Sequence, residues 1–190
     1  MSIKLLDITK SFGGKKVLKN LNLDFPDSGL VCVLGNSGSG KTTLLRLIAD
    51  LETADYGTVE IDAGRKISYV FQNDRLLPGF STLENVALVS DTETAKLWLD
   101  RFELGNALGK KPRQLSGGMR RRVALARAFA FLQPGDILLM DEPFKGLDAE
   151  LKSRIIPFMT DFAKQGLVIL VTHDEKEAAL ADLTFYIDEL

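Results

Sequence analysis

The chain has 190 residues, which is enough for one globular domain but too few for two full domains. Hydrophobic residues make up 45% and charged residues 26% of the sequence, a composition that argues against a disordered chain. The formal net charge of -2 gives no general attraction to nucleic acid or to an anionic membrane, so no nucleic-acid partner is expected.

Hydrophobic stretches are short throughout the sequence. The run at residues 167–171 is far below the roughly 20 residues that cross a bilayer, and the N-terminus has no signal-peptide pattern. The single cysteine, Cys32, lies in an apolar run and has no partner for a CxxC motif. We expect Cys32 to be buried and to act as a small hydrophobic residue, with a redox or catalytic role as the alternative. The absence of paired cysteines also indicates a protein of the reducing cytosol.

The predicted strands fall into two groups. Alternating apolar and polar residues, typical of half-buried antiparallel strands, occur at residues 1–8, 21–25, 58–61 and 66–71. We expect these segments to form one β layer. Nearly continuous apolar runs, typical of parallel strands that are covered on both faces, occur at residues 30–34, 137–140 and 167–171.

A helical pattern follows each of the three apolar strands, at residues 41–51, 149–164 and 175–181. This alternation of strand and helix predicts an α/β fold with a parallel, doubly wound core. No strand-like run occurs between residues 83 and 132, where helices are predicted around residues 92–102 and 118–131. We therefore expect a single domain over residues 1–190, with an inserted helical subdomain at approximately residues 74–132.

A glycine-rich motif follows the first apolar strand and opens a predicted helix. It fits the pattern GxxxxGK[ST] of a phosphate-binding P-loop and consists of Gly35, Asn36, Ser37, Gly38, Ser39, Gly40, Lys41 and Thr42. Glycines let successive backbone N–H groups surround a phosphate, and the start of the helix adds a positive dipole end. Lys41 would reach the β- and γ-phosphate oxygens and the Thr42 hydroxyl would ligate Mg²⁺, while the adjoining Thr43 would also contact the nucleotide. The alternative is a flexible Gly/Ser turn, which the context of strand, loop and helix disfavours.

Polar side chains end the other two apolar strands. Asp141 and Glu142 are adjacent carboxylates at the end of the second, and His173, the only histidine, follows the third. Ligands of open α/β sheets bind at the carboxyl ends of strands, so these side chains should converge with the P-loop. Asp141 would hold Mg²⁺, Glu142 would polarise the attacking water and His173 would hydrogen-bond the γ-phosphate. The alternative for His173 is a satisfied core residue.

A second candidate anion site precedes the predicted helix at residues 118–131. Ser116, Gly117 and Gly118 combine a hydroxyl with bare backbone N–H groups at a helix start. By itself this pattern is better explained as a helix N-cap. Together with a P-loop, it would allow phosphate to be held from two sides.

These motifs, taken in order, resemble the Walker A motif, Q-loop, signature, Walker B motif, D-loop and H-loop of ABC-type ATPases. The segments that carry the resemblance are residues 35–42, Gln72, residues 115–119, residues 137–142, Asp148 and His173. The resemblance implies that Thr42, Gln72 and Asp141 bind Mg²⁺, that Lys41, Gln72, Glu142 and His173 act in ATP hydrolysis, and that Asp148 lies near the nucleotide. Phe12 looks like the aromatic residue that stacks on adenine, with an edge-strand core residue as the alternative.

The resemblance also implies partners. In this family ATP is held between the P-loop of one subunit and the signature of the other, so we expect a second ATPase subunit, in the simplest case an identical copy. The segment at residues 70–78 looks most like subunits of nitrate, sulfonate and taurine importers, which implies a transmembrane permease and a cytoplasmic location, peripheral to the membrane. Leu76, Leu77 and Phe80 are either subdomain core or the lining of a groove for the permease. A non-transport ABC ATPase, acting in DNA repair or translation, is the alternative function.

One departure from the family pattern follows the signature. Arg121 stands where Gln is usual and completes a run of three arginines, Arg120 to Arg122. The pattern indicates a solvated helix face.

Overall fold

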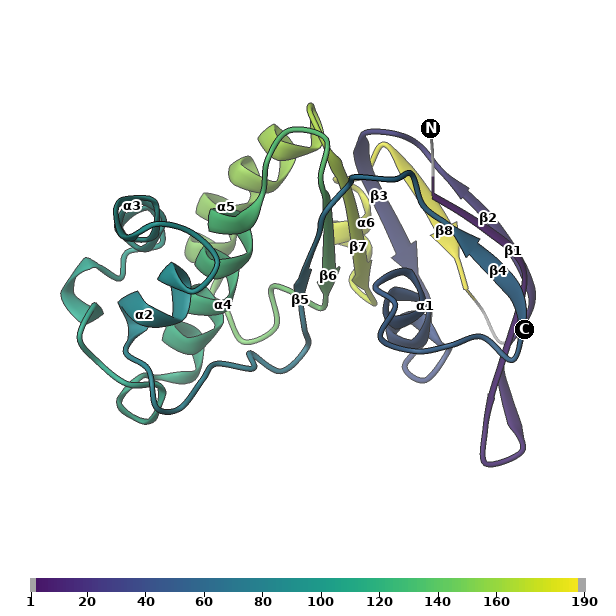
Figure 1. Ribbon diagram of the computed structural model, residues 1–190, viewed down its shortest axis with the longest axis horizontal. Helices are drawn as coiled ribbons and strands as arrows, with labels where there is room; N and C mark the ends of the chain where they lie inside the picture. Colours follow the sequence, from purple (N-terminus) through teal and green to yellow (C-terminus); the bar gives the residue numbers. More distant parts are fainter. Residues whose placement is uncertain (1–2, 188–190) are drawn as a thin grey trace.

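Two β-sheets organise the chain in the computed structural model, which describes residues 3–187 (Figure 1). The antiparallel sheet has the strand order β2-β1-β4 and contains β1 (Ile3–Phe12), β2 (Lys15–Phe25) and β4 (Tyr56–Glu60). The parallel sheet has the order β5-β6-β7-β3-β8 and contains β3 (Gly29–Leu34), β5 (Ile67–Val70), β6 (Ile137–Asp141), β7 (Leu167–Thr172) and β8 (Leu183–Tyr186). Residues 1 and 2 of the first predicted strand lie outside the described residues. The predicted P-loop α/β architecture with an antiparallel β layer is confirmed.

Helix α1 (Lys41–Ile48) lies between the two sheets (Figure 1). Its apolar face shares a core with both of them, to which Leu5 of β1, Val33 of β3 and Leu45 of α1 each contribute a completely buried side chain. Because burying a leucine contributes about 1.5–3 kcal/mol, this shared core holds the start of α1 firmly at the end of β3.

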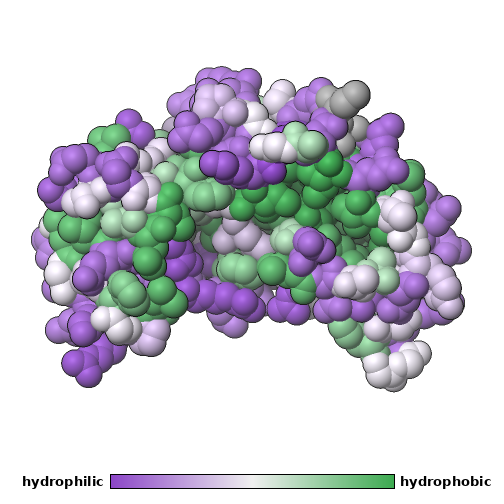
Figure 2. Space-filling model, viewed as in Figure 1, coloured by the Kyte–Doolittle hydropathy of each residue, from purple (hydrophilic) through white to green (hydrophobic). Residues whose placement is uncertain are grey.

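The remaining helices cover the other face of the parallel sheet and extend away from it as a helical lobe (Figure 1). They are α2 (Thr82–Ala87), α3 (Thr92–Arg101), α4 (Gly117–Phe131), α5 (Ala149–Ala163) and α6 (Glu175–Ala178), with the short 3-10 helices η1 (Gly105–Ala107) and η2 (Pro112–Gln114) between α3 and α4. The predicted helix at residues 175–181 is shorter than expected, since after Ala178 the chain tightens and Leu180 N donates to the oxygen of Glu177 at 3.2 Å. Figure 2 shows the resulting arched outline, hollowed between the helices at one end and the antiparallel sheet at the other (compare Figure 1).

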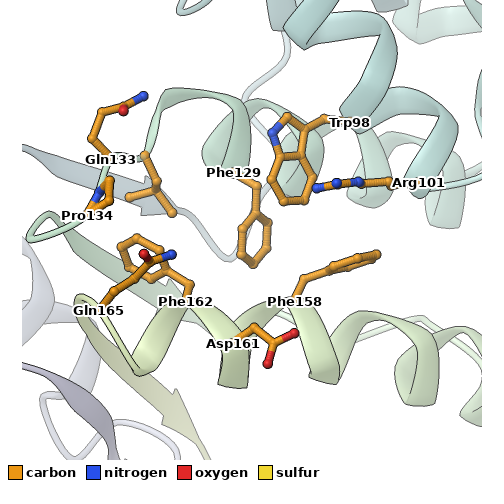
Figure 3. A pocket seen from close by; sticks show the side chains of 10 residues that line it. Trp98, Arg101, Phe129, Gln133, Pro134, Phe158, Asp161, Phe162 and Gln165 are labelled. Carbon is orange, nitrogen blue, oxygen red and sulfur yellow. The ribbon is translucent and has the colours of Figure 1, made fainter.

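An aromatic cluster joins α3 and α4 to α5 (Figure 3). Trp98 of α3 stacks on Phe129 of α4 with ring centroids 5.1 Å apart and meets Phe158 of α5 edge-on at 5.6 Å. Phe102 contacts both phenylalanines and is 1% exposed. The rings leave a cavity of about 370 Å³ between α3, α4 and α5.

The prediction that residues 66–71 belong to the antiparallel β layer is wrong. β5 belongs to the parallel sheet and pairs with β6, with Ser68 opposite Leu138. The alternating pattern is misleading because Ser68 is buried rather than solvated, and its hydroxyl donates to the carbonyl of Ala128 on α4 at 3.1 Å. A serine whose hydroxyl is satisfied in this way can lie on the buried face of a strand.

Strand β8 and the side chain of Arg121 also differ from the predictions. Strand β8 is absent from the predicted strands, because it is a short, half-buried edge strand whose partner β3 lies about 150 positions earlier in the sequence. The expectation of a solvated face at residues 120–122 is wrong for Arg121, which is 3% exposed. Cys32 is completely buried, as expected, and burial raises the pKa of its thiol to about 12.

Candidate functional site

The P-loop connects the end of β3 to the first turn of α1. Gly40 precedes α1 with φ of 98°, a left-handed conformation that favours glycine. Gly35 is required for space, since a Cβ there would lie 2.2 Å from the carbonyl oxygen of Ile187. The hydroxyl of Ser39 is buried and makes no hydrogen bond to any residue that the structure describes. Tight glycine turns and an unsatisfied hydroxyl at a helix start fit a loop that receives an oxyanion.

The Lys41 side chain is 6% exposed and folds back over its own loop. Its Nζ donates to the carbonyl oxygens of Gly35 at 2.6 Å and Asn36 at 2.7 Å. Burial lowers the pKa of Lys41, while the carboxylates of Glu142 and Asp141 oppose that shift. A buried ammonium group beside bare N–H groups creates a positive site suited to phosphate oxygens.

The end of β6 brings Asp141 to the P-loop. The Thr42 hydroxyl donates to Asp141 Oδ2 at 2.9 Å, and Asp141 is 2% exposed. Burial raises the pKa of Asp141 and the charge of Glu142 adds to this, although the hydrogen bond from Thr42 opposes it. A hydroxyl and a carboxylate at this distance fit the oxygen donor set that Mg²⁺ prefers, with waters at the remaining positions.

Glu142 is the centre of the polar side chains at this sheet edge. Its carboxylate accepts a hydrogen bond from Gln72 Nε2 at 3.2 Å, lies 3.1 Å from His173 Nδ1, and forms an ion pair with Lys145 Nζ at 3.4 Å. Burial acts to raise the pKa of Glu142, but the hydrogen bonds from Gln72 and His173, together with the charge of Lys145, hold the pKa below its ordinary value. The carboxylate is therefore ionised at neutral pH. The His173 side chain is 66% exposed, so the alternative of a satisfied core histidine is wrong.

A cavity of about 230 Å³ lies between these groups. Its lining contains half of the predicted residues together with Val17 of β2, which sequence reasoning missed: Val17, Ser37, Gly38, Gly40, Lys41, Thr42, Thr43, Gln72, Asp141 and Glu142. A valine in an alternating strand carries no signal of its own, and it is the fold that brings β2 against the P-loop.

The other predicted residues lie outside this lining. Ser116 caps α4 by accepting from Met119 N at 3.2 Å, and Asp148 caps α5 by accepting from Leu151 N at 2.8 Å. A Cβ added to Gly118 would approach the carbonyl of Gly146 at 3.8 Å, so the signature adjoins the segment before α5 rather than the P-loop. Phe12 is 45% exposed at the tip of the β1–β2 hairpin, so it is not a core residue.

Comparison with known proteins agrees with this geometry. The model of the ABC transporter family matches residues 18–145, which include the P-loop, Gln72, the signature and Asp141–Glu142. The chain belongs to the ABC transporter family.

Relatives of this ABC transporter cassette are import ATP-binding proteins by name. The sulfate/thiosulfate import ATP-binding protein CysA of Acinetobacter baylyi is 40% identical over an alignment of 202 positions. The alignment covers 94% of this chain and 57% of that protein. The chain therefore spans a little over half the length of that curated relative. The aliphatic sulfonates import ATP-binding protein SsuB 2 of Agrobacterium fabrum is 39% identical over an alignment of 200 positions. The alignment covers 99% of this chain and 76% of that protein.

A solved structure of an ATP-binding cassette has the same fold. The dimeric, post-hydrolysis state of the cassette MJ0796 bound to ADP and Pi matches this ABC transporter cassette with a TM-score of 0.89 and 32% identity, covering 97% of this chain and 94% of that one. In the part of the chain that the structure describes, no helix is long and apolar enough to cross a membrane.

Proposed function

We propose that this protein binds and hydrolyses Mg²⁺-ATP and thereby energises solute import by an ABC transporter. The observation that carries the proposal is the convergence of Lys41, Thr42, Asp141 and Glu142 on one cavity. The names of the relatives favour import over the alternative of a non-transport ATPase. We propose further that residues 1–190 form a single cassette domain, with the helical subdomain at about residues 74–132.

The chemistry follows from what each side chain does at the cavity. Lys41 and the N–H groups of the P-loop bind the phosphates and neutralise their charge. Thr42, Asp141 and Gln72 would hold Mg²⁺, which supplies further neutralisation of the phosphate oxygens when bound. Glu142, ionised and held by hydrogen bonds, accepts a proton from the attacking water, and His173 orients the Glu142 carboxylate from its exposed side.

We propose that the site is completed by a second copy. Ser116, Gly117 and Gly118 present a helix start that does not belong to the cavity of their own chain, which supports a head-to-tail pair in which each signature binds the nucleotide of the other copy. The related cassette MJ0796 is dimeric in a state bound to ADP and Pi, which supports the pairing of two copies. Phe12, exposed beside Lys10 Nζ at 5.0 Å from its ring, is available to stack on adenine, and Asp148 would lie near the dimer contact.

A permease would place this subunit at the cytoplasmic face of the membrane. Leu77 and Phe80, between β5 and α2, are 42% and 40% exposed, whereas Leu76 packs against the core. Leu88 and Val89, which follow α2, are also exposed. A further cavity of about 230 Å³ lies between β5, Val89 and α4. We propose that these apolar side chains form the docking surface for the permease.

The proposal is tested on the protein and on its native membranes. We expect purified protein to bind ATP with Mg²⁺ in calorimetry and to release phosphate, and tagged protein to co-purify with a multi-span permease from native membranes. Absence of nucleotide binding would refute the assignment of the site. Co-purification with ribosomes or DNA-repair factors would keep the ATPase chemistry and overturn the transport role.

A further inference from the structure

Arg121 connects two segments of the candidate site although it lines no part of the cavity. It lies on α4, five positions after the N-cap Ser116, and is 3% exposed. Its guanidinium makes five hydrogen bonds within the described part of the chain. Nε donates to Pro143 O at 2.7 Å, Nη1 to Phe71 O at 2.5 Å and Asp74 Oδ1 at 3.4 Å, and Nη2 to Asp141 O at 3.1 Å and Glu142 O at 2.7 Å.

The acceptors belong to two segments that are far apart in the sequence. Phe71 and Asp74 lie on either side of Gln72 after β5, whereas residues 141–143 begin at the last residue of β6 and include Glu142. The guanidinium is a rigid planar fork, so the distances between its acceptors are fixed when all of them are bound. One side chain therefore sets the spacing between the backbone of Gln72 and the backbone of Glu142.

The backbone of Glu142 depends on such a contact. Glu142 has φ of 45°, a left-handed conformation that costs a non-glycine residue energy and that persists only when its surroundings enforce it. Arg121 binds the carbonyl of Glu142 and the carbonyls on both sides of it. The Glu142 carbonyl has one further donor, Lys145 N at 3.3 Å. A neutral side chain at position 121 would remove the charge-assisted hydrogen bonds to all three carbonyls.

We propose that Arg121 is a positioning residue that holds the Gln72 segment and the Glu142 segment in one arrangement, so that the Gln72 amide and the Glu142 carboxylate meet. Because Arg121 lies on the helix that begins at the signature, the position of α4 is linked directly to the geometry of Glu142. The residue that makes these contacts, Arg121, stands where the family pattern usually has Gln.

Hydrogen exchange of the protein without nucleotide tests the structural half of this inference. Arg121→Met should speed amide exchange in both segments, residues 71–74 and 141–145. Two matched controls lie on the same helix. Arg127 binds only the first segment, through Arg75 O at 3.1 Å and Asp74 O at 3.3 Å, so Arg127→Met should affect that segment alone. Arg122 binds Phe102 O at 3.0 Å and Glu103 O at 3.3 Å, so Arg122→Met should affect neither.

Steady-state kinetics test the catalytic half, which rests on the proposed ATPase function. Arg121→Met should lower kcat about tenfold or more, because misplacement of a reacting group by about 1 Å costs up to a hundredfold, while ATP affinity in calorimetry should stay within about twofold. Arg121→Lys keeps the charge but binds at most three acceptors, and we expect its kcat to lie between those of wild type and Arg121→Met. This second variant takes the place of Arg121→Met if that protein does not fold.

The possible failures are distinguishable. A wild-type protein without ATPase activity would refute the proposed function, whereas the exchange experiment would still report on Arg121. Equal kcat in Arg121→Met and Arg122→Met, or faster exchange in only one of the two segments, would overturn the positioning role.

Discussion

Replacing Glu142 with Gln separates ATP binding from ATP hydrolysis. The carboxylate accepts from Gln72 Nε2 at 3.2 Å and lies 3.1 Å from His173 Nδ1. The Gln amide has nearly the same shape and keeps one acceptor oxygen for Gln72, and His173 can accept from the amide in its other tautomer. The local geometry is therefore retained, while the negative charge and the ability to take a proton are lost.

The expected loss of rate follows from that difference. A positioned general base contributes about 10²–10⁴-fold, so kcat should fall by this factor, which is about 3–5 kcal/mol in activation free energy. Affinity for Mg²⁺-ATP should be unchanged or higher, because a negative charge near the γ-phosphate has been removed. With hydrolysis blocked, ATP should hold two copies together, so we expect a dimer in size-exclusion chromatography with light scattering.

Lys145→Met is the matched control for this prediction. Lys145 also contacts Glu142, but its side chain is 64% exposed, and exposed ion pairs contribute little. We expect its kcat to remain within about threefold of the wild-type value. Retention of wild-type turnover by Glu142→Gln would refute the assignment of Glu142 as the base. A Glu142→Gln protein that binds ATP but remains monomeric at high concentration would count against completion of the site by a second copy.

Three further predictions concern other parts of the molecule. His173→Ala should lower kcat about a hundredfold with little change in ATP affinity, and wild-type turnover in this variant would remove His173 from the site. Lys41→Met should weaken ATP binding about 10–100-fold in calorimetry, because each charge-assisted hydrogen bond contributes about 1.5–3 kcal/mol, and an unchanged Kd would contradict the phosphate role of Lys41. Phe102→Ala should lower the free energy of unfolding in urea by about 3–5 kcal/mol, since Phe102 is 1% exposed within the aromatic cluster of α3, α4 and α5. The exposed Phe80→Ala serves as its control and should change stability by less than about 0.5 kcal/mol.

The sequence by itself determined the features that depend on neighbouring residues. The residues of the P-loop are contiguous in the sequence. The local sequence, which contains the glycines, Lys41 and Thr42, therefore specifies the turn between strand and helix without help from distant residues. Asp141, Glu142 and His173 each end an apolar run, and the rule that parallel strands end at one edge of the sheet correctly predicts that they lie near the P-loop.

Only the tertiary structure decided the features that depend on distant partners. Ser68 has the alternation of a half-exposed strand, but its hydroxyl bonds to Ala128 of α4, 60 positions later, so the polar residue lies on the buried face of β5. Arg121 has the composition of a solvated face, but carbonyl groups 20 to 50 positions away surround its guanidinium. A buried polar group is stable only where its hydrogen bonds are satisfied, and the partners that satisfy them are brought together by the fold rather than by the local sequence.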